Sequence, residues 1–124
     1  MKRRTRGAAR GERGAVTAEL ALGLPLLCAL TLALVWMLAV AMAQIRAVDA
    51  ARETARALAR GESEQQAVDL GRAVAPPGAT FTVHSAGEQV RVRVRGPMKG
   101  PGGIFDSLPG VELEAEAVAL LESP

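Results

Sequence analysis

The most extended pattern in the chain is an apolar run from Leu20 to Ala43, 24 residues without a charged side chain. As a helix rising about 1.5 Å per residue, the run would be about 36 Å long, enough to cross the ~30 Å hydrocarbon core of a bilayer. Gly23 and Pro25 interrupt its first third, and Pro25 predicts a kink that neighbouring helices would help to accommodate. The pattern therefore predicts a transmembrane helix.

The helical pattern continues beyond the apolar run. Residues 44–60 contain no proline or glycine and are rich in strong helix formers. Gly61 is a natural helix end. A narrow apolar stripe recurs at helical spacing, formed by Ile45, Val48, Ala55 and Leu58. We expect one long helix over 15–61, with its membrane span at about 20–43 and an extension outside the membrane over 44–61.

The pattern changes twice after this helix. Ser63 and Gln66 form a capping box that predicts a short helix, ending at Pro76-Pro77-Gly78. Its expected apolar face consists of Ala67, Leu70, Gly71 and Val74. The period then becomes two over Thr80–Ser85, Gln89–Arg95 and Val111–Ala119, with a loop rich in glycine and proline over 97–110. The whole predicts an α+β fold: a long N-terminal transmembrane helix, then a short helix and a small three-stranded antiparallel sheet in a domain over 62–124.

The last two expected strands carry charges of opposite sign at every second position. The strand over 89–95 has Arg91, Arg93 and Arg95 on one face, and the strand over 111–119 has Glu112, Glu114 and Glu116. We expect antiparallel pairing of Arg95 with Glu112, which brings Arg93 opposite Glu114 and Arg91 opposite Glu116. Each cross-strand pair would contribute roughly 0.2–1 kcal/mol. The alternative is that each charged face simply meets water.

Charge is distributed unevenly along the chain. Residues 1–14 contain six basic side chains and one acidic side chain, Glu12, whereas the remainder has nine basic and twelve acidic side chains. Basic residues beside a membrane span stay on the cytoplasmic side. We therefore expect a basic cytoplasmic leader over 1–14 and an extracytoplasmic C-terminal domain. The basic segment has no aromatic neighbours and precedes a membrane span, which argues against nucleic-acid binding.

Catalytic and metal-binding signals are missing from the sequence. Cys28 is the one cysteine and lies within the apolar run, and His84 is the one histidine and lies in an expected strand. No metal-spaced cluster and no glycine-rich phosphate loop occurs. We expect no enzymatic activity, no metal, no cofactor and no small-molecule substrate.

The segment Gly14-Ala15-Val16-Thr17-Ala18-Glu19 stands at the edge of the apolar run. A glycine after a basic tail, four uncharged residues and a glutamate opening a membrane helix resemble the processing site of type IV pilins. The resemblance implies that a prepilin peptidase cuts between Gly14 and Ala15, and that Glu19 is the glutamate at position five of the mature chain.

Physical chemistry gives Glu19 a special position independently. A carboxylate that enters the hydrocarbon is costly and needs a partner. Cleavage after Gly14 would create an amine on Ala15, four residues from Glu19 and on the same helical face. That amine, or the one on a neighbouring subunit, would neutralise the carboxylate. The alternative is an ordinary acidic residue near a helix N-terminus, lying among the lipid headgroups.

A wider stretch resembles the TadE-like minor pilins of tight-adherence (Flp) pilus systems. The resemblance rests on Glu19-Leu20-Ala21-Leu22 with Pro25-Leu26-Leu27, and on Val48-Asp49-Ala50-Ala51-Arg52-Glu53 beyond the apolar run. It implies insertion in the inner membrane, trimming by prepilin peptidase and assembly with other pilin subunits and Tad proteins, with Glu19 and Pro25 in helix packing. Ala15 and Val16 stand where major pilins commonly have an aromatic residue, which favours a minor component.

Two other functions fit the same pattern. Ala41-Met42-Ala43 is a signal-peptidase motif, and a cut after Ala43 would release a secreted domain beginning at Gln44. Against this alternative, the apolar run is much longer than the usual signal-peptide core. An unprocessed single-pass anchor for a binding or scaffold domain is the other alternative.

Overall fold

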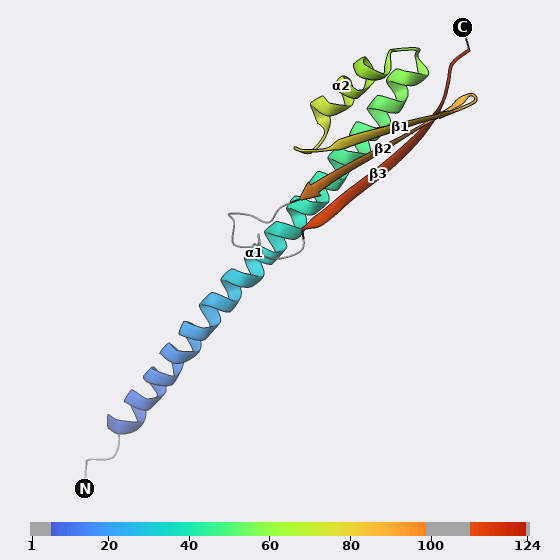
Figure 1. Ribbon diagram of the computed structural model, residues 1–124. Helices are drawn as coiled ribbons and strands as arrows, with labels where there is room; N and C mark the ends of the chain where they lie inside the picture. The colour runs from blue at the N-terminus through green and yellow to red at the C-terminus, as the bar shows by residue number, and fades with distance from the viewer. Residues whose placement is uncertain (1–5, 99–109, 124) are drawn as a thin grey trace. The chain divides into compact units, whose positions relative to one another are not determined.

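A computed structural model describes residues 6–98 and 110–123 of the chain. Its elements, in chain order, are α1 Arg6–Ala59, α2 Glu64–Val74, β1 Thr80–Ala86, β2 Gln89–Met98 and β3 Val111–Leu120 (Figure 1). The α+β fold class is confirmed, with a long apolar first helix, a short second helix and a three-stranded antiparallel sheet. Most of the loop expected over 97–110 lies outside the described residues, and Pro97 and Met98 belong to β2.

The chain divides into two compact units, Met1–Val35 and Trp36–Pro124. In the first unit, the described structure is the N-terminal part of α1. Every residue from Arg10 to Val35 is exposed, although the segment is strongly apolar. The helix continues through Pro25 without interruption. A long helix that is apolar on all sides is suited to lipid or to other apolar helices rather than to water.

The C-terminal end of α1 is closed by a local motif. Gly61 has a φ of 89°, a left-handed conformation that costs glycine little. Its amide donates to the carbonyl of Leu58 at 3.0 Å, and the amide of Glu62 donates to the carbonyl of Ala57 at 3.2 Å. These two bonds form a Schellman motif, which confirms the helix end expected at Gly61.

The three strands form one sheet in the order β1-β2-β3, with antiparallel neighbours. The register between β2 and β3 differs from the expected one by two residues. Arg95 lies opposite Glu114 and Arg93 opposite Glu116, whereas Glu112 lies opposite Pro97. A shift of two keeps every side chain on its expected face, so valines still line one face of β2 and arginines the other.

The core of the second unit lies between the C-terminal half of α1 and one face of the sheet, and the strands run alongside that half of the helix (Figure 1). Valine side chains from β2 meet small residues of α1. The buried members of this cluster are Ala47, Ala50, Ala51, Ala55, Ala79, Val90, Val92, Val94 and Ala115. Alanine has almost no side-chain volume or entropy to lose, so the helix can lie close to the sheet.

The apolar stripe expected on this part of α1 is partly wrong. Ala55 is buried, and Val48 and Leu58 pack at the edge of the core, but Ile45 is 54% exposed. The buried face is centred instead on Ala47, Ala50 and Ala51, and it continues through Thr54, Ala55 and Ala57. The sheet packs against this face because its small side chains allow the helix and the sheet to approach each other closely.

Helix α2 begins with the predicted capping box. The Ser63 side chain accepts from the Gln66 amide at 3.3 Å, and the Gln66 side chain accepts from the Ser63 amide at 3.4 Å. The buried face of α2 is narrower than expected, because Ala67 and Gly71 are buried while Leu70 and Val74 are more than two-fifths exposed.

Candidate processing site and strand ladder

The segment from Gly14 to Glu19 lies within α1, and its residues are exposed. A side-chain carbon added at Gly14 would have no atom within 4 Å. The Thr17 hydroxyl donates to the carbonyl of Arg13, one turn earlier in the helix, at 2.9 Å. Gly14 therefore lies on the open surface of the helix.

The helix brings Ala15 and Glu19 onto one face, because residues four apart are neighbours across one turn. Glu19 is exposed, and none of the ion pairs within the described chain includes it. Its carboxylate directly precedes the apolar run Leu20–Ala43, so a partner for the charge would have to come from a new amine or from another molecule.

A second cluster of sequence-predicted residues lies on the outer face of the sheet. Arg93 contacts Glu116 at 3.0 Å and Glu114 at 3.3 Å. Arg91 contacts Glu116 at 3.4 Å, and Arg95 contacts Glu114 at 3.2 Å. Two of these four contacts are direct cross-strand pairs, and two are diagonal. The result is a continuous chain of alternating charge across β2 and β3.

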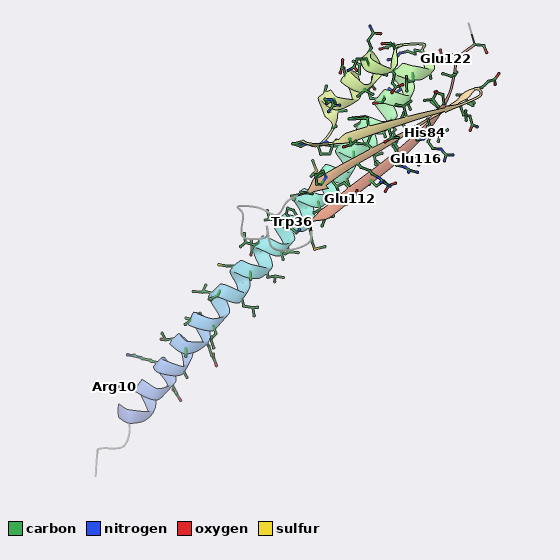
Figure 2. The ribbon with its side chains drawn as sticks, in the orientation of Figure 1. Arg10, Trp36, His84, Glu112, Glu116 and Glu122 are labelled. Carbon is green, nitrogen blue, oxygen red and sulfur yellow. The ribbon has the colours of Figure 1, made fainter. Side chains whose placement is uncertain are left out.

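Glu112 does not join this ladder in the described structure, because the register places it opposite Pro97. Figure 2 shows Glu112 and Glu116 along β3, with Glu122 beyond the end of the strand. Arg91, Arg93, Arg95, Glu114 and Glu116 are brought together. All are partly exposed, so the ladder contributes modestly to stability.

Comparison with known proteins identifies the family of this chain. The model of TadE-like proteins matches residues 14–56. Among curated proteins, the apoptosis inhibitor Rv3655c of Mycobacterium tuberculosis is 37% identical over 97 residues, which cover 78% of this chain and 70% of that relative. The chain belongs to the TadE-like family. No solved structure matches it.

Membership in the TadE-like family makes the chain a pilin-like protein related to Tad pili. The family match begins at Gly14 and continues through the apolar run into the part of α1 that carries the alanine face. Among the helices of the described residues, one is long and apolar enough to cross a membrane, and that helix is α1. The TadE-like chain is accordingly a single-pass membrane protein.

The remaining residues singled out from the sequence lie apart from one another. Pro25 and Cys28 are exposed on the membrane-spanning part of α1. His84 lies in β1, opposite Arg91 on β2, and is also exposed (Figure 2). In the part of the TadE-like chain that the structure describes, no group of His, Cys, Asp and Glu side chains could hold a metal ion.

Sequence reasoning missed a close contact between the two helices. Thr54 on α1 is fully buried, and its hydroxyl has no hydrogen-bond partner within the described residues. Gly71 on α2 lies directly against it, and a side-chain carbon added there would overlap the Thr54 hydroxyl. An isolated glycine in a helical pattern was the available signal for a close approach, although it does not identify the partner.

Proposed function

We propose that this TadE-like protein is a minor pilin or pseudopilin of the inner membrane, trimmed by a prepilin peptidase between Gly14 and Ala15. Its N-terminus faces the cytoplasm, and its C-terminal unit lies outside the membrane. After trimming, the apolar part of α1 exchanges lipid for neighbouring pilin helices during assembly of a Tad pilus. The partners are membrane lipid, the peptidase, other pilin subunits and Tad assembly proteins.

One observation carries this proposal. Gly14 and Glu19 stand at the start of an exposed apolar helix, and the family match begins at Gly14. The helix sets Ala15 and Glu19 one turn apart, so cleavage would create an amine beside a carboxylate that otherwise enters lipid unpaired. The six basic residues before Ala15 support the cytoplasmic orientation of the leader.

The exposed face of the apolar helix supports assembly with other helices. Gly23, Ala21, Ala29 and Ala33 keep parts of its surface small, and helices in membranes approach each other at such surfaces. Pro25 removes one backbone donor and frees a carbonyl, which a neighbouring subunit would satisfy in the assembled bundle.

The mature N-terminus provides the direct test. The chain is expressed in its native host, isolated from the membrane fraction, and measured as an intact mass with N-terminal sequencing. We expect a chain that begins at Ala15. A chain beginning at Gln44 would instead identify a secreted domain, and one beginning at Met1 or Lys2 an unprocessed anchor.

A further inference from the structure

An apolar pocket of about 690 Å³ lies within the second unit, beside α1. The helix contributes Ala39, Met42, Ala43 and Arg46 to its wall. The opposite wall comes from the turn between α2 and β1 and from the paired ends of β2 and β3, including Leu113. This volume lies in the range of pockets that hold small organic ligands.

The position of the pocket along α1 relates it to the bilayer. Ala39, Met42 and Ala43 are among the last residues of the uncharged run, and Arg46 is the first charged residue after it. In a chain inserted as proposed above, on which this inference rests, these residues occupy the level where acyl chains give way to headgroups. The pocket is therefore next to lipid rather than to bulk water.

The chemistry of the lining selects among lipids. Among the described residues of the wall, Arg46 carries the one charged side chain, and the others have apolar side chains or are glycine. It is exposed, and none of the ion pairs found within residues 6–98 and 110–123 involves it. A guanidinium binds phosphate oxygens through two parallel hydrogen bonds. The lining thus combines a surface for hydrocarbon with one cation suited to phosphate.

We propose that the pocket binds an anionic phospholipid from the leaflet next to the C-terminal unit. One acyl chain lies against Met42, Ala43 and Leu113, and the phosphate lies at Arg46. The charge complementarity of Arg46 makes the site selective for a lipid with net negative charge over a zwitterionic one. The lipid would fix the depth at which the sheet stands above the membrane.

Photocrosslinking in vesicles tests this proposal. The full chain is reconstituted in phosphatidylcholine vesicles that contain a small fraction of phosphatidylglycerol with a photoreactive acyl chain, or the same fraction of a photoreactive phosphatidylcholine. Labelled peptides are identified by mass spectrometry. We expect the glycerol lipid to label the peptides of Ala39, Met42 and Leu113 about fivefold more than the choline lipid does, the effect of one basic side chain near an anionic headgroup.

Matched variants separate the pocket from ordinary lipid contact. Arg46→Gln should lower labelling by the glycerol lipid to the level of the choline lipid, whereas Arg52→Gln, an exposed arginine of α1 outside the lining, should leave it unchanged. Ala43→Phe, which fills the pocket, should remove the label at Leu113. Ala29→Phe, on the exposed apolar part of the helix, should not.

Four outcomes would overturn the lipid site. Equal labelling by both lipids, undiminished in Arg46→Gln, would remove the selectivity on which it depends. Crosslinks between two copies of the chain that disappear in Ala43→Phe would assign the pocket to a second copy. A chain that resists carbonate extraction but carries no label at Leu113 would refute the lipid site alone, whereas a chain extracted by carbonate would refute membrane insertion as well.

Discussion

Gly71 of α2 and Thr54 of α1 lie so close together that a side-chain carbon at Gly71 would overlap the Thr54 hydroxyl. The same carbon would lie 3.0 Å from the Ala50 carbonyl oxygen and 3.0 Å from Cε1 of Phe81. The contact therefore requires glycine on α2, and it fixes how closely the short helix packs against the long one.

Gly71→Ala should cost the second unit about 1–3 kcal/mol through overpacking and return about 1 kcal/mol through the helix propensity of alanine, so we expect a net destabilisation of up to about 2 kcal/mol. Urea denaturation of the full chain in detergent micelles, followed by circular dichroism, measures the change. The double variant Thr54→Ala/Gly71→Ala should recover part of the loss. Equal losses in the single and double variants would show that the Thr54 hydroxyl does not limit the approach.

Thr54→Val tests the unpartnered hydroxyl directly. Valine keeps the branched shape and removes a buried polar group that has no hydrogen-bond partner in the described structure. Because such a group costs about 1–3 kcal/mol, the variant should raise the free energy of unfolding by about 1 kcal/mol. A lower free energy of unfolding in the same denaturation experiment would mean that the hydroxyl has a partner in solution.

The strand ladder makes a prediction that depends on the register. Glu116→Gln removes contacts to both Arg91 and Arg93, whereas Glu112→Gln on the same strand removes none of the ion pairs found within the described residues. We expect Glu116→Gln to lower stability by roughly 0.5 kcal/mol at low salt, with a smaller effect at high salt, and Glu112→Gln to leave stability unchanged. A larger effect at Glu112 would favour the register expected from the sequence, in which Arg95 lies opposite Glu112.

Gly14→Leu should leave a full-length precursor in the membrane, because a bulky side chain next to the scissile bond would hinder the peptidase. Gly11→Leu is the matched control, since Gly11 also has open space around it and lies three residues before Gly14. Immunoblotting of membrane fractions separates precursor from mature chain. Normal trimming of Gly14→Leu would contradict the proposed cut.

Glu19→Ala should permit trimming but impair incorporation into pili, because the new amine on Ala15 or on a neighbouring subunit would lose its partner. Glu19→Asp, which keeps the charge on a shorter side chain, should retain more incorporation. The measurement is the amount of the subunit in sheared pilus fractions relative to the membrane pool. Unchanged incorporation of Glu19→Ala would exclude the pairing role.

The sequence predicted those features that local chemistry determines. Ser63 and Gln66 define the start of α2, and Gly61 defines the end of α1, because caps and left-handed glycines act within a few residues. The alternation of β2 and β3 assigned each side chain to a face. It did not fix the register, since arginines and glutamates at every second position form ion pairs in registers that differ by two.

Contacts between distant segments were beyond the sequence pattern. Ile45 is more apolar than Ala47, yet Ala47 is buried and Ile45 is exposed, because the position of the sheet decides which face of α1 is covered. The contact of Thr54 with Gly71 and the pocket beside Arg46 likewise depend on which elements meet in space. At the candidate processing site, by contrast, the residues Gly14 to Glu19 are contiguous, so their spacing was readable from the sequence.

The lengthwise contact between α1 and the sheet has a mechanical consequence. Ala47, Ala51 and Ala55 meet the valines of β2 along the axis of α1, and the proposed extraction of the subunit from the bilayer would pull the helix in that direction. Traction on α1 would load these contacts together in shear instead of peeling them apart one by one. The hydrogen bond from the Glu122 amide to the Ala59 carbonyl, 3.0 Å long, ties the segment after β3 to the same helix, so the second unit would move with its part of α1 as a single piece.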